Sequence, residues 1–151
     1  MSPTVKPIPD GYHAVTPYLA VEDAARLVEF LKAAFDAQVL FSMPSPSGGV
    51  SHAELQINDS RVMVGQPMGS SKPTTSMLYL YVNDVDRVFK QAVKAGGKVV
   101  AEPANQFYGD RNGALKDPGG NTWSIATHVE DVAPEELARR SANARSQSAA
   151  S

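Results

Sequence analysis

The sequence predicts an α+β protein in which two βαβββ modules in one chain form a cup-shaped mixed sheet with the helices on its outer face. The first supporting observation is an internal repeat, because residues 16–28 and 77–89 resemble each other at a spacing of 61, the difference between positions 16 and 77. Identical pairs at this spacing are Tyr18 and Tyr79, Leu19 and Leu80, Val21 and Val82, Asp23 and Asp84, and Arg26 and Arg87. The second observation is that each copy has an alternating stretch followed by a helical stripe of apolar residues, so one supersecondary unit occurs twice.

The first copy follows an N-terminal arm. Pro3, Pro7 and Pro9 oppose a helix and predict an extended arm over 1–12. Residues 14–21 alternate as in a strand, and Asp23 is placed to cap a helix. The apolar stripe of that helix is Ala24, Leu27, Val28, Leu31, Ala34 and Phe35. Three further strands are predicted at 39–43, 51–57 and 61–66, and the second of them carries His52, Glu54 and Gln56 on one face.

The second copy repeats this order after a predicted linker over 67–75. A strand over 77–82 precedes Asp84, which caps a helix that Gly96 and Gly97 end. Strands are predicted at 98–101, 114–116 and 122–127, with 102–113 irregular and 117–121 a tight turn. The resulting organisation is a first module over 13–66, a second module over 76–130, and a short C-terminal helix with a frayed tail over 131–151.

The composition excludes several classes of function. The chain is 42% hydrophobic and 20% charged, with a formal net charge of −2, and it has no basic stripe for nucleic acid. No apolar run reaches membrane-spanning length. There are no cysteines, which excludes disulfides, thiolate metal sites and a cysteine nucleophile. The proline-rich start lacks the apolar core of a secretion signal, so a cytoplasmic location is expected.

Three stretches carry a resemblance to a known family. They are residues 15–23 (VTPYLAVED), residues 80–86 (LYVNDVD) and residues 117–125 (DPGGNTWSI). With the repeat, they resemble the vicinal oxygen chelate superfamily, which includes glyoxalase I, bleomycin-resistance proteins and extradiol dioxygenases. The stretch 123–131 (WSIATHVED) is similar to the PhnB-like branch. The resemblance covers roughly residues 13–130. It implies the fold and a homodimer, in which a partner chain closes the cup, but not the chemistry, because the superfamily contains both enzymes and drug binders.

The resemblance also implies where a metal would be bound. In metal-using members, ligands lie seven residues before the aspartate that opens each helix, which corresponds to Thr16 and Met77. Another ligand lies three residues after the asparagine of the DPxGN turn, at Ser124, and the repeat maps it to Met63. A hydroxyl and a thioether are poor ligands for hard or borderline divalent ions, so we expect no metal and no cofactor. His52 and Glu54 share a strand face and form an alternative two-ligand or acid–base pair.

The remaining candidates face the predicted cup. Alternation places Tyr18 of the first copy, and Met77, Tyr79 and Tyr81 of the second, on the face opposite the helices, where the tyrosines either contact a ligand or fill the interior. Trp123 alternates toward the core. Arg111 either holds an anionic ligand or forms a loop clamp with Asp110. The predicted ligand-binding set is Tyr18, Met63, Met77, Tyr79, Tyr81, Arg111 and Ser124.

Three functions remain open from the sequence. The leading hypothesis is a metal-free small-molecule binding protein of the glyoxalase or bleomycin-resistance type, with a planar or aromatic ligand in the cup. The alternative is a glyoxalase-like lyase or isomerase, with a displaced metal site or with His52 and Glu54 as catalytic residues. The third is a homodimeric structural or regulatory module.

Overall fold

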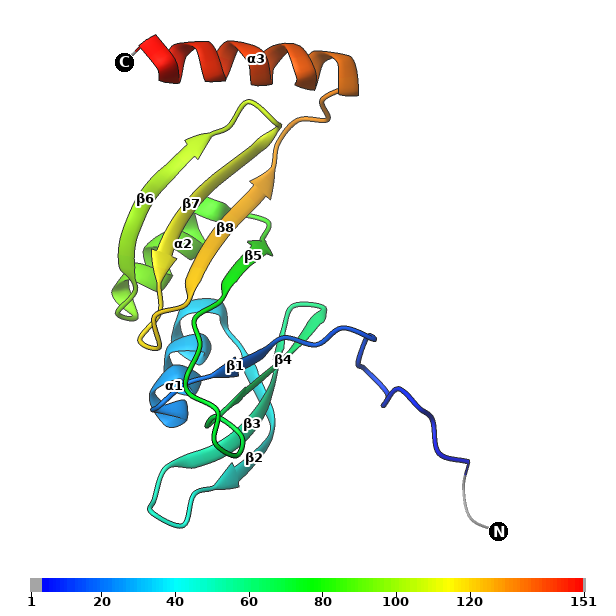
Figure 1. The fold of residues 1–151 in the computed structure, drawn as a ribbon, viewed down its shortest axis with the longest axis vertical. Helices are drawn as coiled ribbons and strands as arrows, with labels where there is room; N and C mark the ends of the chain where they lie inside the picture. The colour runs from blue at the N-terminus through cyan, green and yellow to red at the C-terminus, as the bar shows by residue number, and fades with distance from the viewer. Residues whose placement is uncertain (1–3, 151) are drawn as a thin grey trace.

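Two modules of the same design follow each other along the chain (Figure 1). The computed structural model describes residues 4–150. The first module contains β1 (Tyr18–Ala20), α1 (Ala24–Phe35), β2 (Gln38–Pro44), β3 (Val50–Ile57) and β4 (Ser60–Gly65). The second contains β5 (Met77–Tyr81), α2 (Val85–Lys94), β6 (Lys98–Asn105), β7 (Asp110–Lys116) and β8 (Thr122–His128), and α3 (Pro134–Ala150) follows it.

The two sheets have equivalent topology. Their strand orders are β1-β4-β3-β2 and β5-β8-β7-β6. In each sheet the first strand pairs in parallel with the last, as Tyr18 does with Met63 and Tyr79 with Ser124, and the other pairs are antiparallel. The predicted α+β fold with two βαβββ modules is therefore confirmed. Within residues 4–150 the two sheets stay separate and do not close into a barrel.

Equivalent aspartates begin the two module helices, as the repeat predicts. The Asp23 carboxylate accepts a hydrogen bond from the Arg26 N–H at 3.1 Å, and Asp84 accepts one from the Arg87 N–H at 3.2 Å. Each bond satisfies one of the N–H groups that a helix start leaves unpaired. After α2 the chain turns at Gly96, whose φ of +114° is accessible mainly to glycine.

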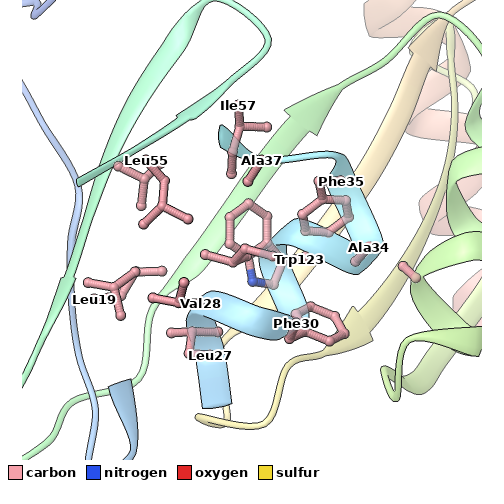
Figure 2. Close-up of a cluster of buried hydrophobic side chains, with 14 of the residues drawn as sticks. Leu19, Leu27, Val28, Phe30, Ala34, Phe35, Ala37, Leu55, Ile57 and Trp123 are labelled. Carbon is pink, nitrogen blue, oxygen red and sulfur yellow. The ribbon is translucent and has the colours of Figure 1, made fainter. Parts of the chain in front are cut away.

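The modules share one hydrophobic core. Helices α1 and α2 pack against each other, and the Gln91 side chain of α2 donates to the Ala33 carbonyl oxygen of α1 at 3.0 Å. Figure 2 shows Trp123 of β8 among side chains of the first module, including Leu27, Val28 and Phe35. Its ring lies 4.9 Å from that of Phe35, measured between centroids, and only 2% of the residue is exposed. The expected core position of Trp123 is confirmed, and it fixes one module against the other.

One part of the predicted secondary structure is wrong. Residues 102–113 were expected to be irregular, but β6 continues to Asn105 and β7 begins at Asp110, so most of this stretch is a β-hairpin. Pro103 lacks a backbone N–H, which is unfavourable inside a sheet. However, β6 is an edge strand, where a proline is tolerated, and the register shifts between Ala101 and Ala104 around it.

The C-terminal helix is longer than the short helix expected before a frayed tail. Its alanines, arginines and glutamine favour a helix, and no glycine or proline interrupts it after Pro134. Figure 1 shows α3 crossing the end of the β6–β7 hairpin, where Arg140 pairs with Glu130 at 2.7 Å. Residues 1–3 of the predicted arm and Ser151 of the predicted tail lie outside the described residues. None of the helices described is both long and apolar enough to span a membrane.

Candidate functional site

Each sheet has one face covered by its helix and one face that we call open. On β5, Leu78 and Leu80 pack against the core, whereas Met77, Tyr79 and Tyr81 are 72%, 43% and 54% exposed. The alternation in the sequence predicted this orientation. The residues of the second open face include Met77, Tyr79, Tyr81, Asp110, Asn112, Ser124, Ala126 and His128.

A buried carboxylate, Asp110, organises the second open face. Its Oδ2 accepts hydrogen bonds from the hydroxyls of Tyr79 at 2.6 Å and Tyr81 at 2.8 Å. Its Oδ1 lies 2.8 Å from Nδ1 of His128, the residue opposite it on β8. The residue is only 4% exposed, so these partners replace the water that a surface carboxylate would bind. Asp110 therefore holds two aromatic rings and one imidazole in fixed positions.

His128 lies between two carboxylates. Its Nδ1 faces Asp110 and its Nε2 faces Asp131 at 2.7 Å. Ionised carboxylates only accept hydrogen bonds, so the two contacts are both satisfied when the imidazole is protonated, and they favour that form. The bonds to Asp110 and then to Asp131 raise the pKa of His128. Burial raises the pKa of Asp110, but the hydrogen bonds from Tyr79, His128 and Tyr81 outweigh it and hold that pKa below its usual range.

The tyrosine hydroxyls of this face are fixed as donors. Burial, followed by the hydrogen bond to Asp110, raises the pKa of Tyr79. The pKa of Tyr81 is also raised, mainly by its hydrogen bond to Asp110. Both phenols therefore stay protonated. Their ring centroids are 5.2 Å apart with the planes tilted by 54°. Ala126, on the strand beside them, is fully buried, so the face offers aromatic surface above a floor of small residues.

The first open face carries the predicted acid–base pair. His52 Nε2 lies 3.6 Å from the Glu54 carboxylate, and Tyr18 stacks on the His52 ring with centroids 5.8 Å apart. The N-terminal arm covers part of this face, because the Tyr12 hydroxyl donates to Glu54 and the Arg61 guanidinium lies 5.0 Å from the Tyr12 ring centroid. Burial, then Glu54, raises the pKa of Tyr12. Glu54 is thus already engaged.

The structure divides the predicted ligand-binding residues between different places. Tyr18 and Met63 are register partners on the first open face, and Tyr79 and Ser124 are partners on the second, where Met77 also lies. Arg111 lies on the helix side of the second sheet, where its guanidinium binds both oxygens of Asp86 on α2 at 2.9 Å. Arg111 therefore faces away from the tyrosines and makes its ion pair with Asp86.

Of the four positions at which the family would bind a metal, Met63 and Thr16 border cavities. Met63 lines a cavity of about 270 Å³ under the arm, whereas Tyr79, the neighbour of Ser124, borders a different cavity of about 180 Å³ between the modules. Thr16 borders both cavities. No group of three or more His, Asp or Glu side chains within the described part of the chain is arranged to hold a metal ion.

A cavity of about 790 Å³ adjoins the second open face at the seam between the modules. It shares Tyr81 and His128 with that face, and its other walls include the end of α1, the β3–β4 turn, and Arg87 and Val88 of α2. Its volume is in the range of sites for drug-sized molecules.

Sequence reasoning missed the residues that organise the second open face. Asp110 was weighed only as a clamp for Arg111, and neither His128 nor Asn112 was among the predicted ligand-binding residues. The repeat held a signal for Asn112 alone. At the spacing of 61, the first-copy strand at 51–57 maps to 112–118, which begins the strand two residues earlier than predicted and includes Asn112 but not Asp110 or His128.

Comparison with known proteins assigns the chain to a family. The profile of the Glyoxalase/Bleomycin resistance protein/Dioxygenase superfamily matches residues 12–125, and the chain belongs to this superfamily. An uncharacterized protein of Mycobacterium bovis is 38% identical over 135 residues, which are 82% of this chain and 89% of the relative.

Solved structures agree with this assignment. The crystal structure of TioX from Micromonospora sp. ML1 matches with a TM-score of 0.67 and 28% identity, over 76% of this chain and 97% of TioX. TnmS3, an antibiotic binding protein from Streptomyces sp. CB03234, matches with a TM-score of 0.63 and 20% identity, over 77% of this chain and 95% of TnmS3. At 20% identity the likeness shows the fold alone.

Proposed function

We propose that this protein binds a planar or aromatic small molecule without transforming it, and that the ligand lies against Tyr79 and Tyr81 on the second open face. One observation carries the proposal: the hydroxyls of both tyrosines are bonded to Asp110, while the two residues stay about half exposed, at 43% and 54%. Rigid aromatic rings bind a flat ligand at little entropic cost. The adjoining cavity of about 790 Å³ supplies room for the rest of a drug-sized molecule. Within the superfamily, residues 123–131 favour the PhnB-like branch.

The binding is proposed to need no metal. Thr16, Met63, Met77 and Ser124 stand at the positions where metal-using relatives have ligands, and they supply only hydroxyls and thioethers. Elemental analysis of protein purified without chelator tests this point. Near-stoichiometric Zn, Ni, Mn or Fe bound at these positions would contradict it.

The protein is proposed to act as a homodimer. Apolar side chains remain exposed on both sheets, among them Phe41 and Met43 of β2 and Met77 of β5, at 49%, 47% and 72%. A second copy of the chain would cover these surfaces, and twofold dimers are the commonest such arrangement. Sedimentation at micromolar concentration is the test, and a monomer with no concentration dependence would argue against it.

The alternative function is a glyoxalase-like lyase or isomerase. The specific observation in its favour is that His52 and Glu54 lie side by side on the first open face, with Nε2 and the carboxylate 3.6 Å apart, so a small closure would bring this acid–base pair into hydrogen-bond reach. The hydrogen bond from Tyr12 to Glu54 weighs against it, because a catalytic base needs that carboxylate free.

Two variants separate the functions. If binding is the function, Tyr79→Ala should weaken ligand affinity by roughly 1–3 kcal/mol, the scale of a buried aromatic contact, and His52→Ala should matter much less. Titration and turnover assays would use planar tricyclic aromatics, glyoxal–thiol adducts and glycopeptide drugs. Turnover in the wild-type protein that is lost in His52→Ala, with affinity preserved, would establish the enzyme instead.

A further inference from the structure

The turn between β6 and β7 holds an aromatic residue, Tyr108, at the edge of the second open face. The Gln106 N–H donates to the Asp110 carbonyl oxygen at 2.7 Å, and the Gly109 N–H donates to the Gln106 carbonyl oxygen at 3.2 Å. Arg140 of α3, which crosses this turn in Figure 1, donates to the Phe107 carbonyl oxygen at 3.2 Å. The turn is therefore held from inside the hairpin and from the C-terminal helix, so Tyr108 is fixed in place.

The direction of each hydrogen bond in this network can be assigned from chemistry. Asp110 only accepts, so the hydroxyl protons of Tyr79 and Tyr81 point toward it. The Tyr79 oxygen can then only accept, which means that the group facing it at 2.9 Å is the amide nitrogen of Asn112. The second proton of the same nitrogen goes to the Tyr108 oxygen at 2.7 Å, and the Asn112 oxygen accepts from Gln106 at 3.1 Å.

One donor remains available to a ligand after this assignment. The Tyr108 oxygen accepts from Asn112, and its own proton is directed to the neighbouring Tyr79 hydroxyl or to solvent, where a ligand acceptor can take its place. The residue is 37% exposed, so the hydroxyl is accessible from solvent. It shares the Asn112 amide nitrogen with Tyr79 and so lies close to the aromatic surface on which the ligand is proposed to bind.

The ionic groups at this end of the face are already paired. Asp110 is paired with His128, and Arg111 is paired with Asp86 on the other side of the sheet. A charged ligand would therefore compete with existing ion pairs, whereas a neutral ligand would not.

We propose that Tyr108 is a specificity-determining residue, which selects neutral planar aromatic ligands carrying a hydrogen-bond acceptor such as a ring carbonyl. This inference rests on the proposed function and deepens it by naming the ligand class. The Tyr79 and Tyr81 rings supply contact area to any flat molecule, and the Tyr108 hydroxyl distinguishes molecules with an acceptor within its reach. A buried or half-buried donor favours a ligand that pairs with it over an isosteric ligand that does not.

The test uses two planar tricyclic probes that differ by one carbonyl oxygen, 9-fluorenone and fluorene. Equilibrium dialysis measures the affinity of each probe for the wild-type protein, Tyr108→Phe and Tyr79→Ala. Tyr12→Phe is the matched control, because it removes a tyrosine hydroxyl from the first open face. We expect the wild-type protein to bind fluorenone more tightly than fluorene. Tyr108→Phe should weaken fluorenone binding about 2- to 10-fold and leave fluorene binding unchanged. Tyr12→Phe should bind both probes as tightly as the wild-type protein does.

The outcomes separate the two proposals. If Tyr108→Phe weakens both probes equally, the residue acts through structure and not as a donor, and the inference is wrong. If both probes bind equally to wild type and Tyr79→Ala weakens both, the aromatic site stands and the acceptor preference is wrong. If neither probe binds to the wild-type protein up to its solubility limit, the proposed aromatic binding function fails together with this inference.

Discussion

Replacing Asp117 with alanine should destabilise the protein by about 3–5 kcal/mol, because N–H groups from three residues converge on its carboxylate. The Gly119 N–H donates at 2.8 Å, the Asn121 N–H at 3.0 Å and Trp123 Nε1 at 2.8 Å. The Asn121 side-chain amide also reaches both carboxylate oxygens, at 3.3 and 3.1 Å. These bonds tie the β7–β8 turn to the tryptophan that joins the modules.

The magnitude follows from burial. The substitution would leave three donors without an acceptor: the Asn121 N–H, the Asn121 side-chain amide and Trp123 Nε1. Asn121 is fully buried and Trp123 is 2% exposed, so water cannot replace the lost carboxylate there. Each buried donor left without a partner costs about 1–3 kcal/mol, and neighbouring losses add incompletely. Gly119 is partly exposed and contributes little, because water replaces the carboxylate there. A loss of this size is a large fraction of the total stability of a typical domain.

Urea unfolding followed by tryptophan fluorescence is a direct assay, because Trp123 is the only tryptophan of the chain. Asp23→Ala is the matched control: it removes an exposed cap with a single hydrogen bond and should cost about 1 kcal/mol. Asp117→Asn, which keeps one acceptor oxygen, should lie between the two and remains measurable if the alanine variant does not fold. A cost for Asp117→Ala no greater than that for Asp23→Ala would refute the reasoning.

Two further predictions concern the surroundings of the second open face. Gly109→Ala should destabilise the protein clearly more than Gly48→Ala in the same urea assay. Both glycines have positive φ, at +102° and +91°. A Cβ on Gly109 would lie 2.2 Å from the Glu130 carbonyl oxygen, whereas a Cβ on Gly48 would have no atom within 4 Å. Equal losses of stability in the two variants would contradict the close approach at Gly109. His128 should make stability depend on pH, because its folded pKa is raised above the usual 6.5, first by Asp110 and then by Asp131. Its stabilising contribution is complete below the unfolded pKa and disappears as pH rises through the folded pKa. The stability difference between wild type and His128→Gln should therefore shrink as pH rises above the usual His pKa of 6.5, and a difference that stays constant on the alkaline side would contradict the raised pKa.

The local elements were accessible to sequence reasoning where one face of the element is buried. The helix caps at Asp23 and Asp84, the alternation of β5 and the core position of Trp123 all follow from periodicity and repetition. The β6–β7 hairpin did not follow from local signals, because Pro103 opposes a strand and only its edge position makes it acceptable. Propensity is a local property, whereas tolerance of a proline depends on which strands are neighbours.

The candidate site was only partly accessible for the same reason. Alternation placed Tyr79 and Tyr81 on the open face, but not the carboxylate that holds them, because Asp110 lies in the first part of β7, which was predicted only from residue 114 onward. Arg111 is the next residue along the chain and points to the other side of the sheet. A shift of one residue reverses the face of a side chain, so an error in the strand boundary is an error in the site.

The sequence by itself determined the repeated module, the helix starts and the superfamily, because these depend on patterns within about twenty residues and on their recurrence. The tertiary structure decided which polar groups meet. The hydrogen bonds from Tyr79 to Asp110 and from Tyr12 to Glu54 join residues separated by 31 and 42 positions. Such contacts are set by strand order and register, which bring distant residues within hydrogen-bond reach and which no local pattern encodes.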